Sequence, residues 1–330
     1  MTLVIGTDEA GYGPNLGPLV VAASVWRLDA GPLAVEATLA DALLRAAEAA
    51  DAGPPHHAFS AAPLWSDSKQ VYRGGSKTQG HGLAALEAGV LTAIAMATGA
   101  VPRDWTMFAA ATDIGRMAAP PPEWPSLAST VLPRSVQADR CVVRSERITA
   151  TLAAKGIRLE KILCRVVHPG EFNGHLDSGL NKADLLSQVT LTLAADACRR
   201  AVPDEPIVIW CDRHGGRKHY AAVVARHFDC PLVHAIEETP MRSAYDLPAS
   251  DCRIEFCVGG ERRGPVALAS MTAKYVREVA MEAFNAFWTA RSPGLASTAG
   301  YPVDAVRWRR DAAAAIRAAA VADHDLWRRA

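Results

Sequence analysis

Two β-prone runs separated only by a glycine-rich connection limit most strongly how this sequence can fold. Residues 3–7 and 19–26 are rich in valine and other apolar residues, and several glycines lie between them. Two such runs joined by a short connection predict an antiparallel hairpin at the start of a sheet. The first run ends at two adjacent acids, Asp8 and Glu9. Because strand ends deliver side chains to the surface of a scaffold, these acids are the first candidates for a functional site.

Two neighbouring carboxylates repel each other unless positive charge lies beside them. Water satisfies them in a solvated acidic turn, whereas a divalent metal ion does so in hydrolases of phosphate esters. Two further acids follow predicted strands, since Asp212 ends the run 207–211 and Glu261 follows the run 253–258. If these strands are neighbours, four carboxylates meet at one edge of the sheet and could bind two Mg²⁺ or Mn²⁺ ions roughly 3.5–4 Å apart.

Beyond the hairpin, strands and helices alternate along the sequence. Strands are predicted at 157–167, 207–211, 232–236 and 253–258, and helices at about 33–52, 82–97, 182–200, 218–227, 265–288 and 304–320. A hairpin followed by this alternation predicts an α/β fold with a mixed central sheet, in which the hairpin and parallel strands are flanked by helices. We expect one catalytic domain over residues 1–330, with a helical extension at approximately 291–330.

A proline-dense stretch interrupts this alternation. Residues 102–134 contain a cluster of prolines between 120 and 133, which predicts an irregular insertion over the core that extends to about residue 154. The sequence leaves open whether the 102–154 insertion is a lid, a partner surface or only packing.

Composition excludes several classes of protein. The chain has 35 Lys and Arg against 35 Asp and Glu, so any positive surface for a polyanion must be local. Seven cysteines without a Cys-x-x-Cys pair predict reduced thiols and a cytoplasmic protein. The fold is expected to begin too early for a signal peptide, and no apolar run is long enough for a membrane span. We therefore expect no membrane partner.

Short motifs along the chain add a more specific indication. They are Asp-Glu-Ala-Gly-Tyr-Gly at 8–13 with Gly-Pro-Leu-Val-Val-Ala-Ala at 17–23, Asp-Ser-Lys at 67–69, Val-Ile-Trp-Cys-Asp at 208–212, Val-Gly-Gly-Glu at 258–261, Leu-Ala-Ser-Met-Thr-Ala-Lys-Tyr-Val-Arg-Glu at 268–278 and Gly-Tyr-Pro at 300–302. In this order they resemble the motifs of the type 2 ribonucleases H, the family of ribonucleases HII and HIII.

This resemblance implies an RNase H-like fold and a monomeric, metal-dependent endonuclease that acts on nucleic acid. The substrate would be the RNA strand of RNA/DNA hybrids, or duplex DNA cut on the 5′ side of an embedded ribonucleotide, leaving a 5′-phosphate. The resemblance makes four residues both catalytic and metal-binding, with two Mg²⁺ or Mn²⁺ ions as the cofactor: Asp8, Glu9, Asp212 and Glu261.

The resemblance also implies how substrate is bound. The turn of Gly11, Tyr12 and Gly13 would meet the ribose 2′-hydroxyl through its backbone, a group that only RNA offers. Glycine suits this position because the backbone must approach the sugar closely. Tyr301 would lie against the neighbouring deoxyribose, where an added hydroxyl would clash.

Phosphates would be held by basic residues of two motifs. The resemblance assigns this role to Lys69, Lys274 and, less directly, Arg277, which position a strand without reading its sequence. Two departures bear on activity: Tyr12 stands where the family has a basic residue, and Glu261 stands where it has aspartate.

These departures leave two alternatives open: a nucleic-acid-binding protein with feeble catalysis, and a nuclease of the same chemistry with altered ribose selectivity. His214 and His219 lie close to Asp212 in sequence and could assist proton transfer, although solvated loop histidines are the simpler interpretation. No Cys or His set completes a zinc site with them. Cys211, next to Asp212 on a strand, is predicted to face the core.

Overall fold

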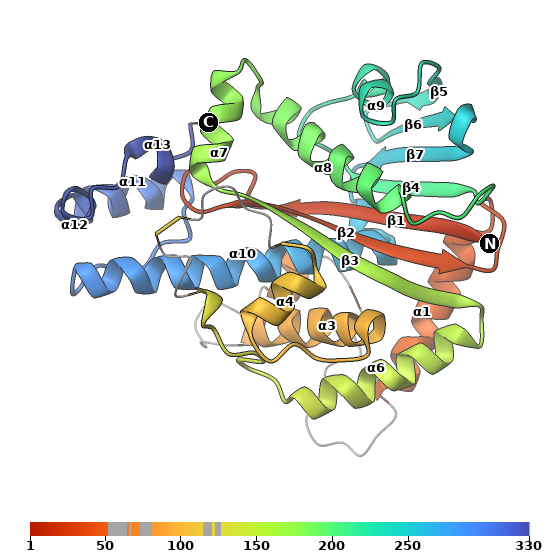
Figure 1. Cartoon of the computed structure of the whole chain (residues 1–330), viewed down its shortest axis with the longest axis horizontal. Coiled ribbons are helices and arrows are strands. Elements are labelled where there is room, and N and C mark those ends of the chain that lie inside the picture. The colour runs from red at the N-terminus through yellow and green to blue at the C-terminus, as the bar shows by residue number, and fades with distance from the viewer. Residues whose placement is uncertain (52–64, 66–67, 73–80, 115–120, 123–126, 330) are drawn as a thin grey trace.

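A computed structural model describes residues 1–51, 65, 68–72, 81–114, 121–122 and 127–329. Its centre is a seven-stranded sheet in the order β3-β2-β1-β4-β7-β6-β5 (Figure 1). The strands are β1 (Thr2–Ala10), β2 (Leu19–Leu28), β3 (Ile157–Val167), β4 (Ile207–Asp212), β5 (His234–Glu238), β6 (Arg242–Leu247) and β7 (Cys252–Cys257). β1, β4 and β7 run parallel, and the other neighbours pair antiparallel. The predicted mixed sheet with an N-terminal hairpin is confirmed.

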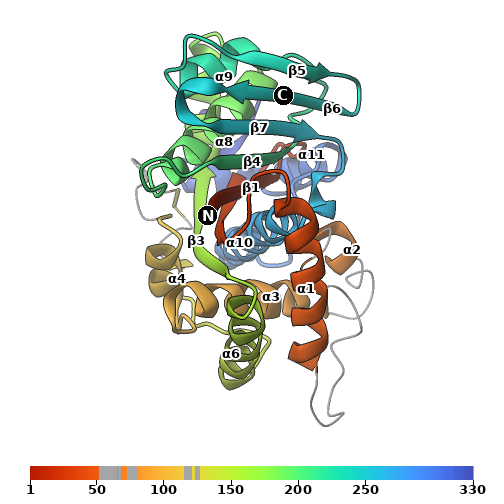
Figure 2. The ribbon, with the colours of Figure 1, turned by 90° about the vertical axis from the view of Figure 1, so that its right-hand side faces the viewer.

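Helices cover both faces of this sheet (Figure 2). On one face lie α1 (Val35–Asp51), α2 (Ser68–Tyr72), α3 (His81–Thr98), α4 (Trp105–Ala111), α6 (Ala138–Ala153) and the long α10 (Gly264–Arg291). On the other lie α7 (Pro169–Asp177), α8 (Lys182–Cys198) and α9 (Ala221–His227). A third apolar cluster joins the second half of α10 to α11 (Pro302–Asp311), α12 (Ala313–Ala318) and α13 (Asp323–Leu326).

Strand alternation decides which side chains enter which core. Along β4, Val208 and Trp210 pack on the α10 side, whereas Ile209 and Cys211 pack on the α8 side. The predicted core position of Cys211 is therefore confirmed. α10 is held to the sheet where it begins, because the buried Ser24 hydroxyl of β2 donates to the Pro265 carbonyl at 2.7 Å.

The 102–154 segment is more regular than expected. The absence of regular structure predicted for residues 102–134 is wrong at α4, because the Asp104 side chain caps this helix by accepting from the Met107 N–H, and the proline cluster begins only after it. α6 was also not anticipated, and it buries Ile148 and Leu152 in the same core as α3 and α10.

The buried carboxylate of Glu87 on α3 ties this segment to the core. It accepts from the backbone N–H groups of Arg134, Ser135 and Val136 and from the Tyr275 hydroxyl. The segment therefore contributes to packing.

Further differences concern the rest of the chain. No element was predicted where β6, α7 and α13 lie, and the single helix expected at 304–320 is divided into α11 and α12. Within the described part of the chain, no helix has the length and apolarity needed to cross a membrane.

Candidate functional site

The pairing of β1 with β4 brings two of the predicted acids to the same place. Thr7 lies opposite Cys211 in this parallel register, so Asp8 and Asp212 follow one step further along neighbouring strands. Val4 and Trp210 face α10, and alternation places Asp8 and Asp212 on that same face. Two distant stretches of sequence therefore deliver carboxylates to one corner of the sheet.

Glu261 reaches this corner from the turn after β7. It lies in η3 (Gly260–Arg262), a short 3₁₀ helix directly ahead of α10. The N–H of Gly260 donates to Asp212 Oδ1 at 2.9 Å, which holds the turn against the end of β4. We refer to Asp8, Asp212 and Glu261 as the carboxylate cluster.

The electrostatics of Asp8 show that the three acids interact. Removal from water, and then the charge of Asp212, raise the pKa of Asp8 to about 8, with a smaller contribution from Glu261. A hydrogen bond from the Ser270 hydroxyl and one from the Glu9 N–H, 2.7 Å from Asp8 Oδ1, act in the opposite direction. A buried carboxyl group next to a second acid is unfavourable in its charged form, and a bound cation would relieve both the burial and the repulsion.

Ser270 is a contact that sequence reasoning missed. It lies on α10 within a motif noted above, and its hydroxyl is 3.0 Å from that of buried Ser68 at the start of α2. The adjacent Lys69 lies in α2, where only its backbone is described. Its side chain and the whole of Asp67 lie outside the described part of the chain. Ser270 thus links Asp8 to the Asp-Ser-Lys motif.

Glu9 is placed differently from the other three acids. Alternation along β1 directs it to the α8 face, opposite to Asp8. After burial, the charge of Glu9 is the main cause that raises the pKa of Tyr12, and the Lys182 ammonium lies 5.0 Å from the centre of the Tyr12 ring. The expected meeting of four carboxylates is therefore not found: Asp8 interacts with Asp212 and Glu261, whereas Glu9 starts on the other face.

The turn that follows β1 is closely held; we call residues 11–16 the glycine turn. Gly11 has φ +85°, and a side chain there would start 2.5 Å from the Pro18 oxygen and 2.6 Å from Arg277 Nε. The Gly300 carbonyl accepts from the N–H groups of Asn15 (2.8 Å) and Leu16 (3.2 Å).

Tyr301 also reaches the glycine turn. Gly300 has φ +82°, and a Cβ there would also lie 2.5 Å from the Leu16 oxygen, so both the backbone and the space favour glycine. The Tyr301 ring that follows lies beside Gly13, 3.8 Å from the position that a Cβ would take there, and is 51% exposed. The Gly-Tyr-Pro motif and the glycine turn therefore form one surface.

The two predicted phosphate contacts on α10 are engaged within the protein. Lys274 Nζ lies 2.6 Å from Glu278 Oε1 and 4.5 Å from the centre of the Tyr72 ring. The Arg277 guanidinium is buried and donates to the Ala299 carbonyl at 2.9 Å. Both would have to exchange these partners, in part, to contact a phosphate.

The two histidines after β4 do not converge. His214 is buried, contrary to the expectation of a solvated loop residue, and lies 3.0 Å from the Ser187 hydroxyl. Burial lowers its pKa to about 3, so it is neutral at physiological pH. His219 is exposed and pairs with Glu238.

The donor set of the carboxylate cluster suits a hard divalent cation, because carboxylate oxygen is the ligand that Mg²⁺ and Mn²⁺ prefer. In its present conformation, the described part of the chain contains no group of three His, Cys, Asp or Glu side chains positioned to hold a metal ion. One oxygen of Asp212 is already occupied by the Gly260 N–H. Metal binding would therefore require side-chain adjustment within the cluster.

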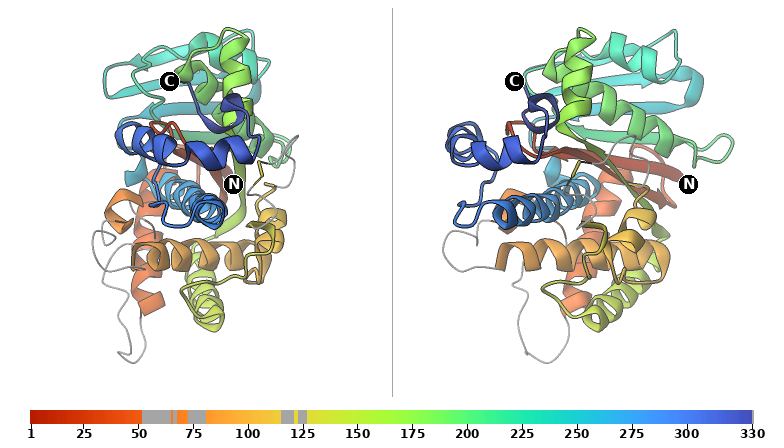
Figure 3. Two further views of the ribbon diagram at one scale, coloured as in Figure 1. Left: turned by 90° about the vertical axis from the view of Figure 1, so that its left-hand side faces the viewer. Right: turned by 60° about the vertical axis from the view of Figure 1, so that its left-hand side comes forward.

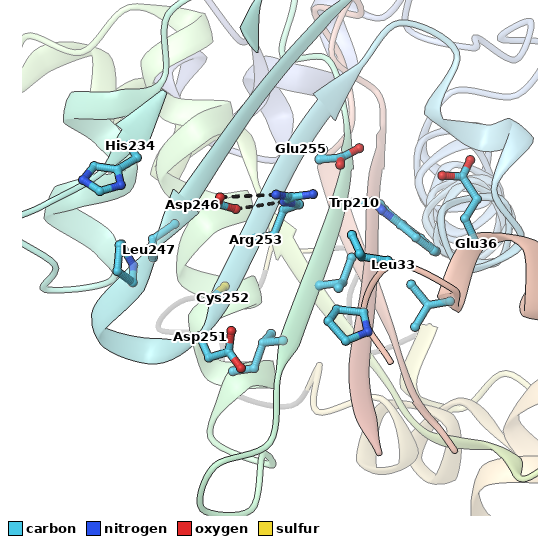
Figure 4. A pocket seen from close by; sticks show the side chains of 15 residues that line it. Leu33, Glu36, Trp210, His234, Asp246, Leu247, Asp251, Cys252, Arg253 and Glu255 are labelled. Carbon is cyan, nitrogen blue, oxygen red and sulfur yellow. Dashed lines mark hydrogen bonds and ion pairs between the residues drawn. The ribbon is translucent and has the colours of Figure 1, made fainter. Parts of the chain in front are cut away.

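A cavity of about 420 Å³ lies elsewhere on the sheet, along β4, β7 and β6 (Figure 4). Its floor includes Arg253, whose Nε donates to Asp246 Oδ1 at 2.8 Å. Of the described residues that line it, none is a predicted site residue. The cavity therefore does not belong to the carboxylate cluster.

Comparison with known proteins yields matches among solved structures only. No protein-family profile matches the sequence, and no curated protein matches it. The chain is similar to a chain of the PCNA:RNase HII complex from Archaeoglobus fulgidus, with 13% identity over 98% of this chain and 93% of that one, at a TM-score of 0.44. It is similar to ribonuclease H2 from Pyrococcus horikoshii OT3, with 13% identity over 98% and 92% of the two chains, at a TM-score of 0.43. It is also similar to Bst-RNase HIII in complex with Mn²⁺, with 16% identity over 99% of this chain and 66% of that one, at a TM-score of 0.39.

Proposed function

We propose that this protein is a divalent-metal-dependent endonuclease of the ribonuclease H type, which cleaves the RNA strand of RNA/DNA hybrids or cuts 5′ of a ribonucleotide embedded in duplex DNA. The observation that carries the proposal is the carboxylate cluster, in which Asp8 and Asp212 from adjacent parallel strands repel each other. Such an arrangement is unfavourable without a cation and is typical of sites that bind one.

Asp8, Asp212 and Glu261 would hold Mg²⁺ or Mn²⁺. Glu9 starts on the opposite face of β1, so its side chain would have to turn around the strand end to join them. The bound ions would supply an activated water and stabilise the charge on the phosphodiester oxygens. The protein's own contribution is to fix these carboxylates on the ends of rigid strands, so that the scissile phosphate is oriented before reaction.

Recognition of substrate would fall to the glycine turn and Tyr301. The backbone of Gly11, Tyr12 and Gly13 follows directly on β1, so a sugar that contacts it would carry its phosphate toward the end of β1, where Asp8 lies. The exposed ring of Tyr301 beside Gly13 offers a flat surface for the neighbouring sugar. Lys69 and Lys274, on the helices α2 and α10, would contact flanking phosphates.

Three duplexes of one base sequence test the proposal: all-DNA, DNA with a single ribonucleotide, and an RNA/DNA hybrid, each with Mg²⁺ or Mn²⁺. We expect cleavage of the ribonucleotide-containing duplexes only, with 5′-phosphate and 3′-hydroxyl ends. Asp8→Asn should abolish cleavage, whereas Asp41→Asn, which changes an exposed acid on α1, should leave it intact. No cleavage by the unaltered protein, or full cleavage by Asp8→Asn, would end the proposal.

A second candidate is a nucleic-acid-binding protein with feeble catalysis. It is favoured by the absence, among the described residues, of three acids already positioned for a metal. It predicts duplex binding that persists in EDTA and no metal-dependent turnover. Equal cleavage of the all-DNA and ribonucleotide-containing duplexes would instead identify a nuclease with altered ribose selectivity.

A further inference from the structure

Residues 323–329 return across the molecule and lie between α7 and the glycine turn (Figure 3). Asn173 of α7 anchors this segment. Its side-chain amide donates to the carbonyls of His324 (2.6 Å) and Trp327 (2.8 Å), and its side-chain oxygen accepts from the Arg329 N–H (2.9 Å). Chain far removed in sequence from β1 is thus docked in a defined place beside the candidate site.

Arg328 joins this segment to the glycine turn. Its side chain is buried, and Nη2 donates to the Gly11 carbonyl at 2.7 Å and to the Pro14 carbonyl. Its backbone N–H donates to the Asn15 carbonyl at 2.8 Å, and its own carbonyl accepts from Asn15 Nδ2 at 2.9 Å. One residue therefore binds three residues of the turn, Gly11, Pro14 and Asn15, from the buried side.

The charge of Arg328 is poorly compensated for a residue that only anchors a loop. Within the described part of the chain, its Nε and Nη1 have no hydrogen-bond partner, and the guanidinium lies 4.9 Å from the centre of the Phe172 ring. Burial, and then the charge of Arg277, lower its pKa to about 9, so it stays protonated at neutral pH. A buried cation with unfilled donors is costly, and an apolar side chain would fill the same space without that penalty.

The direction of the turn's peptide groups follows from these contacts. In a planar trans peptide the C=O and the following N–H point to opposite sides. The Pro14–Asn15 peptide illustrates this, because its carbonyl binds Arg328 while its N–H donates to Gly300 on the other side. By the same geometry, holding the Gly11 carbonyl inward directs the Tyr12 N–H away from Arg328.

We propose that Arg328 is a positioning residue for the glycine turn: it fixes the Gly11 and Pro14 carbonyls inward, aims the Tyr12 N–H outward at the sugar of a bound strand, and places a positive charge beneath that sugar's phosphate. That the turn binds a ribose follows only if the proposed function is correct. That Arg328 holds the turn in its conformation does not depend on the proposed function. Hydrogen bonds in series strengthen one another, so a charged donor behind the Gly11 carbonyl makes the Tyr12 N–H a better donor.

Two measurements on the full chain test this inference. Arg328→Met removes the guanidinium, and Arg328→Lys keeps the charge while removing the fork that spans two carbonyls. Arg329→Met is the matched control, because Arg329 belongs to the same segment but its side chain binds Asn173 and Asp177 instead of the turn. Amide exchange of Asn15 and Leu16 reports on the turn, and the ratio of affinities for single-ribonucleotide and all-DNA duplexes in EDTA reports on recognition.

We expect Arg328→Met to accelerate exchange of these amides and to lower the affinity ratio, each about tenfold, at a temperature where the protein stays folded. Arg328→Lys should fall between this variant and the unaltered protein, and Arg329→Met should match the unaltered protein. General destabilisation would not change the affinity ratio, so an unchanged ratio with Arg328→Met overturns the inference.

If the unaltered protein shows no preference for ribonucleotide, the proposed function fails. Amide exchange then decides the inference alone: faster exchange in Arg328→Met supports the fixing of the turn, and unchanged exchange overturns it.

Discussion

The carboxylate cluster and the glycine turn lie at the same end of β1 but are built in opposite ways. In the cluster, adjacent strand ends bury Asp8 and place it next to Asp212, and burial first and this charge second raise the pKa of Asp8 to about 8. The turn is instead held by hydrogen bonds from distant segments, through Gly300 and Arg328. The cluster is therefore destabilised until a cation binds, whereas the turn is preorganised without any ligand. Functional sites commonly combine a locally destabilised group with a rigid surrounding structure.

The largest expected effect is at Asp8, where one substitution should lower activity and raise stability. Asp8→Asn removes a metal ligand together with a buried carboxyl group whose ionised form is unfavourable in the folded protein. We expect the rate of cleavage to fall by about a thousandfold or more, while the metal-free protein becomes more resistant to heat at pH 7. Cleavage assays and thermal unfolding in EDTA measure the two quantities. A fall in both would mean that Asp8 is a structural residue, and the contrast would be broken.

For the glycine turn, the matching experiment is Gly300→Ala. A Cβ in a left-handed conformation is strained, and here it would also overlap the Leu16 oxygen, so we expect a loss of unfolding free energy of about 3 kcal/mol. Gly294→Ala is the control, because Gly294 has φ +86° but no heavy atom within 4 Å of its Cβ position. It should lose only about 1 kcal/mol. Equal losses measured by urea unfolding would show that docking of Gly300 on the turn contributes nothing.

The pH dependence of stability sharpens the comparison further. The pKa of Asp8 is about 8 in the folded chain and near 3.8 when unfolded, so between these values the folded state holds a proton that the unfolded state has released. Its contribution to stability therefore decreases as pH rises, on the order of 1 kcal/mol per pH unit. The advantage of Asp8→Asn over the unaltered protein should be smallest near pH 4 and should grow up to about pH 8.

Titratable groups that do not interact with Asp8 cancel in that difference. Burial lowers the pKa of His168 to about 4, so both proteins lose stability equally as pH falls from about 6.5 toward 4. A difference that stays constant with pH, measured by thermal unfolding in EDTA, would show that burial and the neighbouring acids do not raise the pKa of Asp8.

The sequence predicts the carboxylate cluster better than it predicts the support of the glycine turn. The acids of the cluster end apolar strands, and strands such as 157–167 were predicted with the bounds that β3 has. The sequence left open whether the strands that end at Asp8 and Asp212 are neighbours, and the parallel pairing of β1 with β4 answers that question. Alternation along β1 places Glu9 on the face opposite to Asp8, which a four-carboxylate prediction has to take into account.

The support of the glycine turn could not be read in the same way. Arg328 binds the carbonyl of Gly11, 317 residues earlier, and no periodicity or motif connects two positions so far apart. β6 was missed because Arg-Ser-Ala-Tyr-Asp-Leu lacks a clear apolar run and becomes a strand only between β5 and β7. Tertiary packing decided both cases.

The smallest expected effect is the response of stability to metal alone. A cation that binds the carboxylate cluster only in the folded state should stabilise the protein by about 1.4 kcal/mol when its concentration is ten times its dissociation constant. Mg²⁺ or Mn²⁺ should therefore raise the melting temperature of the unaltered protein, and more at pH 8 than at pH 6, because protonated Asp8 competes with the metal at the lower pH. Asp8→Asn should respond weakly at both values, while Gly294→Ala should respond as the unaltered protein does. Since the glycine turn lies outside the cluster, amide exchange of Asn15 and Leu16 should not change on metal addition. Slower exchange there would show that the two regions are coupled, and the contrast between a cation-dependent cluster and a preorganised turn would have to be abandoned.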